Sequence, residues 1–133
     1  MKEKLILLQQ NSYSPYSNFA VSAIVIMKDG KEFNGVNVEN AAYGSSICAE
    51  RSAILSAISN GYKKGDFKEI NIMTSSNGIG MPCFQCRQVM SELFDKNVIV
   101  RCYSKTGDYE EHTVEELCPY PFGEDDLKWN VDL

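Results

Sequence analysis

Long apolar runs are missing from this sequence. The longest ones, such as Ala20–Met27, are far too short to cross a bilayer, so no membrane-spanning segment is predicted. The N-terminal region also lacks the basic start, apolar centre and small-residue cleavage site of a signal peptide. We therefore expect a cytoplasmic protein that has no membrane partner.

Basic residues are outnumbered by acidic ones, at 13 Lys and Arg against 18 Asp and Glu, for a net charge of −5. Proteins that bind nucleic-acid phosphates need a basic face, so this balance argues against a nucleic-acid partner. The acidity equally fits a solvated surface with no functional meaning. Internal repeats, low-complexity segments and long linkers are also lacking, and we predict a single domain over residues 1–133.

Hydrophobic periodicity and turn residues predict an alternation of helices and strands. Helices are expected near residues 2–10, 48–60, 86–94 and 113–118, and strands at residues 20–27, 32–38, 69–74, 98–103 and 108–112. This order predicts an α/β fold, a three-layer α/β/α sandwich around a central mixed sheet of about five strands. Two of the helices begin with cysteine elements, so we expect their N-termini to converge over one end of the sheet.

Three of the five cysteines form a pattern typical of a catalytic metal site. Reduced cysteines in an intracellular chain are ligands or buried apolar residues rather than disulfide partners. Cys83 and Cys86 form a C-x-x-C pair, and Cys48 supplies a third soft ligand. Three protein ligands leave a fourth tetrahedral position for water, which is the layout of a catalytic zinc. We predict one Zn²⁺ per chain.

A closed structural site of four thiolates is the alternative, with Cys102 or Cys118 as the fourth ligand. Neither residue has a paired spacing, and Cys102 lies in an apolar run that is typical of a core strand. A redox role for the C-x-x-C pair would leave Cys48 without an explanation. Iron in place of zinc is left open by the pattern.

Five segments together resemble one known family. Cys48–Arg51 and Pro82–Gln88 are similar to the two zinc motifs of the cytidine deaminase family in its homotetrameric, three-cysteine form. The resemblance continues in the same order through Ser14–Phe19, Asn37–Gly44 and Leu117–Leu127. It implies zinc-dependent hydrolytic deamination of the free nucleosides cytidine and deoxycytidine to uridine and deoxyuridine, with release of ammonia, as in pyrimidine salvage.

The resemblance makes Glu50 the catalytic residue. Its position two residues after Cys48 lets the carboxylate point at the metal without binding it, and move a proton from water to the pyrimidine ring. Outside such a motif, a glutamate in the first turn of a helix would simply favour the helix dipole.

Substrate contacts are likewise implied by the resemblance. The residues concerned are Phe19, Asn37, Val38, Glu39, Ala49 and Phe122. Phe19 would line the base pocket, and the Ala49 backbone would read the pyrimidine edge. Asn37 and Glu39 would bind the ribose hydroxyls from alternate strand positions, which point the same way. Taken alone, these two residues fit an exposed strand face.

The C-terminal segment carries the prediction of a shared site. In the resembled family a phenylalanine, here Phe122, stacks on the base bound by a neighbouring subunit of a homotetramer. Pro119, Pro121 and Gly123 are expected to hold this stretch as an ordered non-helical arm. The alternative is that Phe122 packs on the core of its own subunit.

Three thiolates overcompensate the charge of Zn²⁺, so nearby positive charge is expected to offset them. The resemblance gives this role chiefly to Arg51, with Gln88 holding it, and Arg87 is a further candidate donor to the thiolates. A solvated helix position fits Arg87 equally well.

Two positions depart from the family pattern. Phe84 and Ser22 stand where the family usually has glycine, and Phe84 is expected to change either the turn or the pocket wall.

Two other functions stay open. One is the deamination of a modified cytosine nucleoside, as by blasticidin-S deaminase, and the other is a non-catalytic structural zinc protein.

Overall fold

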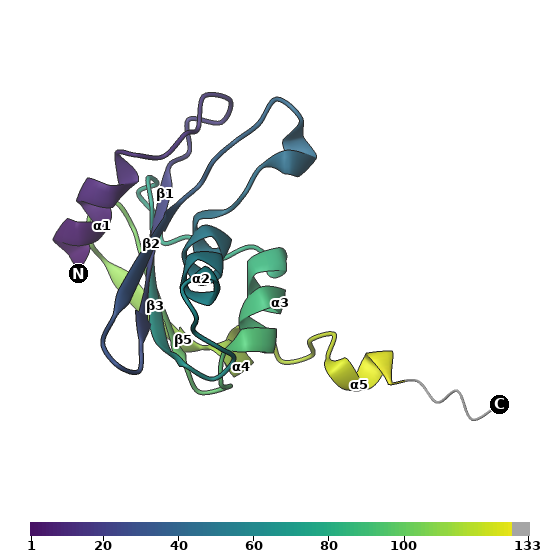
Figure 1. Ribbon diagram of the computed structural model, residues 1–133. Helices are drawn as coiled ribbons and strands as arrows, with labels where there is room; N and C mark the ends of the chain where they lie inside the picture. The colour runs from purple at the N-terminus through teal and green to yellow at the C-terminus, as the bar shows by residue number, and fades with distance from the viewer. Residues whose placement is uncertain (129–133) are drawn as a thin grey trace.

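The computed structural model describes residues 1–128 and shows a five-stranded sheet with helices on both faces (Figure 1). The strands are β1 (Val21–Met27), β2 (Glu32–Val36), β3 (Phe67–Thr74), β4 (Ile99–Tyr103) and β5 (Tyr109–Thr113). The helices are α1 (Lys2–Gln9), α2 (Ala49–Ser59), α3 (Phe84–Leu93), α4 (Val114–Leu117) and α5 (Glu124–Leu127), with a 3₁₀ turn η1 at Tyr43–Ser45. The predicted single domain ends at residue 133, so its last five residues lie outside the described range.

The sheet is mixed, as predicted, with the strand order β2-β1-β3-β4-β5. Strand β1 runs antiparallel to both β2 and β3, and β5 runs antiparallel to β4. Strands β3 and β4 are parallel, which requires a crossover connection, and α3 provides it. The predicted hairpin between β1 and β2 turns at Gly30, whose φ of 92° favours glycine.

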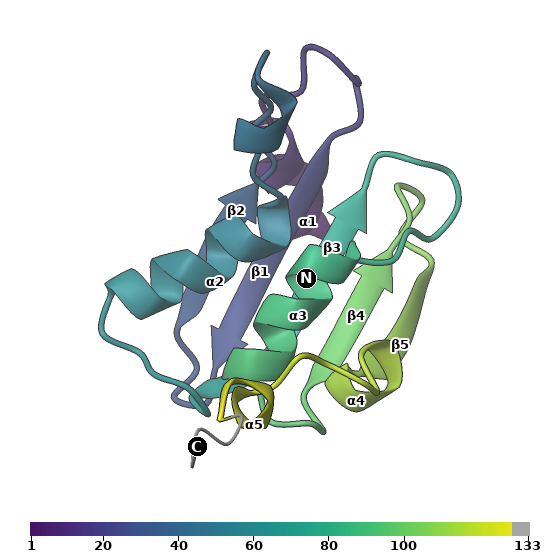
Figure 2. The ribbon, with the colours of Figure 1, turned by 90° about the vertical axis from the view of Figure 1, so that its right-hand side faces the viewer.

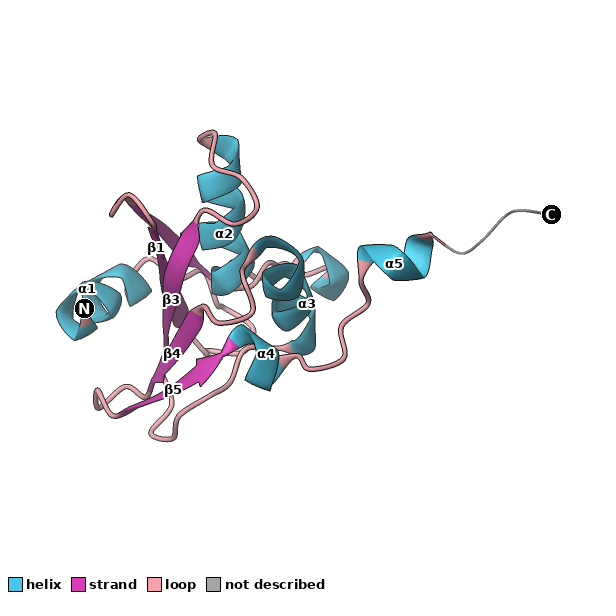
Figure 3. Ribbon diagram, turned by 90° about the horizontal axis from the view of Figure 1, so that it is seen from below, coloured by secondary structure: helices cyan, strands magenta, loops and turns pink. Residues whose placement is uncertain are grey.

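Two apolar cores of different size separate the three layers. Helices α2, α3 and α4 cover one face and α1 covers the other, as Figures 1 and 3 show. The larger core joins α2 and α3 to the sheet and includes Ile54, Met90 and the buried Cys102, which confirms that Cys102 is a core residue. The smaller core lies under α1 around Leu5. The metal motifs therefore lie on the face of the sheet that carries the larger apolar core.

Glycine at position 35 lets α2 lie unusually close to β2. A Cβ atom there would lie 2.3 Å from the Ala49 carbonyl oxygen and 2.4 Å from the Ala53 backbone nitrogen. Both are atoms of the helix backbone, which cannot rotate aside as a long side chain does. Gly35 thus sets the height of the N-terminal end of α2 above the sheet.

Two details of the predicted elements are wrong. Strand β2 ends at Val36, so Asn37 and Glu39 lie just beyond it, in a segment that has isolated bridges at Val38 in place of a continuous strand ladder. The arm after α4 is non-helical only to Gly123, and α5 follows, because Asp126 accepts a hydrogen bond from the Gly123 backbone nitrogen and starts a helix. Within residues 1–128 no helix is both long and apolar enough to cross a membrane.

Candidate active site

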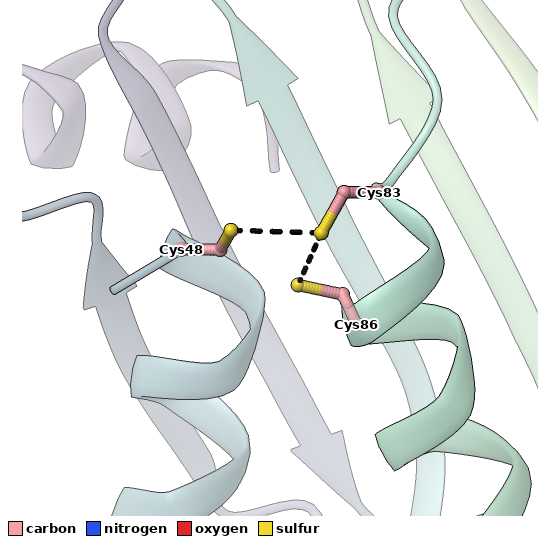
Figure 4. Close-up of side chains that lie close together, drawn as sticks. All are labelled: Cys48, Cys83 and Cys86. Atoms are coloured by element: carbon pink, nitrogen blue, oxygen red, sulfur yellow. Dashed lines mark hydrogen bonds between the residues drawn. The ribbon is translucent and has the colours of Figure 1, made fainter. Parts of the chain in front are cut away.

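The N-termini of α2 and α3 bring three cysteines together (Figure 4). Cys48 precedes α2, while Cys83 precedes α3 and Cys86 lies in its first turn. The Cys83 sulfur is 3.6 Å from that of Cys48 and 3.5 Å from that of Cys86. Figure 2 shows the two helices side by side across one face of the sheet, which places both metal motifs at the same end of it.

This sulfur geometry suits a tetrahedral metal ion. Zinc–sulfur bonds of about 2.3 Å place tetrahedral sulfurs about 3.8 Å apart, close to the spacings found here. Hydrogen bonds from the Cys86 thiol and from Arg51 lower the pKa of Cys48 to about 5. That thiolate, together with burial, raises the pKa of Cys86 far above its ordinary value. A zinc ion between the three sulfurs would replace the thiol protons and hold all three as thiolates, and this donor set and spacing fit it.

A cavity of about 280 Å³ opens beside the cysteines. Its wall includes Cys48 and Cys83, the Glu50 side chain, and Phe19 on the opposite segment. Cys86 is fully buried behind this wall. The cavity is lined mostly by apolar atoms with few polar groups, which is typical of a small-molecule site.

Glu50 combines burial with a place on the cavity wall. Only 5% of the residue is exposed. Burial, reinforced by the negative charge of Cys48, raises the pKa of Glu50 to about 7. A carboxyl group with such a pKa is able both to accept and to donate a proton near neutral pH, as general acid–base chemistry requires.

Arg51 lies directly against the sulfur cluster. Its Nη2 atom donates to the Cys48 sulfur at 3.4 Å, and its Nε atom is buried without a hydrogen-bond partner among residues 1–128. The prediction that Gln88 holds Arg51 is wrong here, because both ends of the Gln88 amide bind the backbone of Phe122. Arg51 is instead fixed by the thiolates that it neutralises.

Arg87 points away from the sulfurs. Its guanidinium donates to the carbonyl oxygens of Pro82 at 2.8 Å and Leu117 at 3.2 Å, and it lies 4.3 Å from the centre of the Phe84 ring. Neither contact is to a thiolate. Phe84 is 73% exposed, takes the first position of α3 and is absent from the cavity wall, so the expected disturbance of the pocket wall does not occur.

Asn37 and Glu39 both line the cavity, and both also hold the neighbouring segment in place. The Asn37 amide donates to the Phe19 carbonyl oxygen at 2.7 Å and accepts from the backbone nitrogen of Val21 at 2.9 Å. Glu39 accepts hydrogen bonds from the backbone nitrogen and the hydroxyl of Ser17, which lower the pKa of its carboxyl group. The segment that carries Phe19 is therefore fixed by the two residues predicted to bind ribose.

Two predicted contact residues lie away from this cavity. Val38 is 46% exposed and is not part of the wall, and Phe122 is 57% exposed at the end of the arm. Ala49 is buried and does line the cavity. The other residues of the wall were not predicted from the sequence: Val21, Ser46, Ile47, Ile72, Thr74, Gly80 and Met81. Thr74 ends a buried strand, and Met81 lies two residues before the C-x-x-C pair. Their positions next to a predicted strand and a predicted metal motif are the features of the sequence that could have indicated a place in the site.

Comparison with known proteins agrees with this geometry. Residues 1–102 match the family described as the cytidine and deoxycytidylate deaminase zinc-binding region. The chain is 37% identical to a cytidine deaminase of Sporosarcina psychrophila, over 98% of this chain and 97% of that one. It is 39% identical to one of Halalkalibacterium halodurans, over 94% and 93%. A crystal structure of cytidine deaminase from Burkholderia pseudomallei is similar at a TM-score of 0.87 and 41% identity, covering 90% of this chain and 94% of that one.

Proposed function

The chain belongs to the cytidine and deoxycytidylate deaminase zinc-binding family, and we propose that it hydrolyses cytidine and deoxycytidine to uridine and deoxyuridine with release of ammonia. One observation carries this proposal. The three-cysteine cluster and the buried Glu50 carboxyl share a cavity whose size and apolar wall suit a pyrimidine nucleoside.

Cys48, Cys83 and Cys86 are the proposed ligands of one zinc ion per chain. When bound, the ion lowers the pKa of water at its open position and so makes a nucleophile available at neutral pH. The positive ends of α2 and α3 and the Arg51 guanidinium offset part of the thiolate charge. Arg51 thereby keeps the three thiolates from weakening the ion as a Lewis acid.

Glu50 is the proposed proton carrier. Its carboxyl group takes a proton from the attacking water and gives it to N3 of the ring, then takes the proton of the new C4 hydroxyl group and gives it to the departing ammonia. Its burial keeps it out of bulk water, and its pKa near 7 suits both directions of transfer. The Ala49 backbone, next to it at the start of α2 and on the cavity wall, is the proposed contact of the pyrimidine edge.

Phe19, Asn37 and Glu39 are the proposed contacts of the nucleoside on the opposite wall. Phe19 packs on the base, while the carboxamide and carboxylate bind the ribose hydroxyls. Glu39 stays anionic because Ser17 holds its carboxylate, and an anion there accepts hydrogen bonds from hydroxyl groups and repels phosphate. This favours free nucleosides over nucleotides.

The protein is further proposed to act as a cytoplasmic homotetramer in which Phe122 completes a neighbouring subunit's site. Support comes from Phe122 itself, which is absent from the wall of its own subunit's cavity and whose side chain is exposed. Val38, the remaining predicted contact, is exposed and also lies outside the wall of its own subunit's site.

An ultraviolet assay of cytidine turnover tests the function directly. The parent protein, loaded with zinc, should convert cytidine, and Glu50→Gln should retain zinc but lose about 10²–10⁴ in turnover, the usual scale for general acid–base loss. Glu92→Gln, an exposed carboxylate on α3, is the matched control and should behave as the parent. Parent-level turnover by Glu50→Gln would rule the mechanism out.

A further inference from the structure

The Phe122 end of the arm is held to its own subunit by the Gln88 side chain of α3. The Gln88 Nε2 atom donates to the Phe122 carbonyl oxygen at 2.6 Å, and the Phe122 backbone nitrogen donates to Gln88 Oε1 at 3.1 Å. The side-chain amide of Gln88 thus both donates to and accepts from the Phe122 backbone, as a residue of a neighbouring β-strand would. Among residues 1–128, Gln88 is the only hydrogen-bond partner of the Phe122 backbone.

The preceding residue holds the other end of the same arm. Arg87 donates to the carbonyl oxygen of Leu117, where α4 ends, and to that of Pro82, just before the cysteine pair. Consecutive residues of α3 therefore bind the arm at positions 117 and 122. Figure 2 shows the arm crossing in front of the end of α3 before α5 begins.

Both contacts involve the backbone of the arm and leave its aromatic rings free. Phe122 is 57% exposed and Tyr120 is 97% exposed, so the alternative in which Phe122 packs on its own core does not apply. The Phe122 ring, on a backbone fixed by two hydrogen bonds, is thus free to contact a group outside the subunit.

We propose that Gln88 is a positioning residue that fixes the Phe122 backbone, so that its effect on catalysis is exerted in the neighbouring subunit's site rather than in its own. This inference rests on the proposed function, in which Phe122 completes a neighbouring cavity. It assigns Gln88 a role different from the one expected from sequence, namely support of Arg51 at its own metal cluster. The two roles make opposite predictions for mixed oligomers.

Three mixtures of variants distinguish the two roles of Gln88. Each mixture is made by co-expressing two differently tagged full-length chains and purifying the zinc-loaded mixed oligomers. Glu50→Ala with Phe122→Ala is the reference, and it should regain activity if sites are built from two chains. Gln88→Ala with Glu50→Ala should also regain activity, because the intact Glu50 site receives its arm from the chain with an intact Gln88. Gln88→Ala with Phe122→Ala should stay inactive, because every arm is defective.

The outcomes separate failure of the inference from failure of the proposed function. Activity in the third mixture and none in the second would place the role of Gln88 at its own metal site and overturn the inference alone. No recovery in the reference mixture would instead overturn the shared site, and the inference with it. Full activity of Gln88→Ala by itself would also overturn the inference.

Hydrogen exchange supplies a readout that does not depend on activity. The Phe122 amide should exchange about tenfold faster in Gln88→Ala, because the hydrogen bond that protects it is lost. Gln88→Glu keeps the acceptor for this amide and loses only the donor, so it should show a smaller increase. Gln85→Ala changes an exposed glutamine one turn earlier on α3 and should leave exchange at Phe122 unchanged. Equal exchange rates of the Phe122 amide in Gln88→Ala and Gln85→Ala would contradict the proposal that Gln88 fixes the Phe122 backbone.

Discussion

Adding one methyl group at Gly35 tests how closely the active site depends on the distance between α2 and β2. The new Cβ in Gly35→Ala would lie 2.3 Å from the Ala49 carbonyl oxygen and 2.4 Å from the Ala53 nitrogen. An ordinary contact of this kind needs more than about 3.3 Å. Either α2 or the edge strand β2 must therefore move by about 1 Å, and α2 carries Glu50.

The expected cost follows from this displacement. Overpacking of a well-packed core costs about 1–3 kcal/mol, which for a domain of this size lowers Tm by about 4–15 °C. A misplacement of about 1 Å in a catalytic group costs about 10² in rate. We expect kcat/KM to fall by roughly this factor while the protein keeps its fold.

Circular dichroism melting, zinc content and cytidine turnover measure the three effects. The control is Gly78→Ala, because a Cβ at Gly78 would meet no atom within 4 Å. A variant Gly35→Ala with parent-level Tm and turnover would refute the close approach itself. A lowered Tm with unchanged turnover would show that β2 moves and that the position of α2 is set by other contacts.

Four further changes have equally specific outcomes. Cys86→Ala should reduce zinc from about one per chain to near zero by atomic absorption, whereas the equally buried Cys102→Ala should retain zinc. Arg51→Gln should lower kcat more than it changes KM in steady-state assays, since it alters the charge at the metal; an unchanged kcat would contradict charge tuning. Ser22→Ala should cost about 1 kcal/mol in denaturant unfolding and leave kcat unchanged, because the buried hydroxyl donates to the Leu5 carbonyl. Free cytosine should show a much lower kcat/KM than cytidine, since it lacks the ribose that positions the ring; equal values would contradict the ribose contacts.

Much of the fold follows from local chemistry that is visible in the sequence. The hairpin at Gly30 rests on turn residues, and the helix that begins after Cys48 rests on its own apolar spacing and on Gly61, which follows it with a φ of 96°. The metal cluster was predictable because the spacing of Cys83 and Cys86 allows a turn entering a helix to present both sulfurs. In these cases the determining contacts lie within a few residues.

The parts that could not be predicted depend on contacts between distant segments. In the sequence Gly35 resembles any other strand residue, because no neighbouring residue indicates that α2 packs directly against it. The close approach is visible only in the folded structure. Gln88 lies two residues after a metal ligand, so a role at the metal was the natural hypothesis, yet its amide binds a segment 34 residues away. The end of β2 before Asn37 likewise depends on side-chain hydrogen bonds to Phe19 and Val21.

The bridging position of the cysteine cluster has a consequence for the lifetime of the folded state. Cys48 and Cys83 are 35 residues apart and stand at the N-termini of α2 and α3, which β3 separates in the sequence. If these helices dock after the transition state for folding, an ion held between them would stabilise the native state alone, and its effect would fall mainly on the barrier to unfolding. Removal of the metal by a chelator should accordingly speed unfolding in denaturant and leave the refolding rate almost unchanged. The metal site of the proposed reaction would then also set the unfolding rate of the protein.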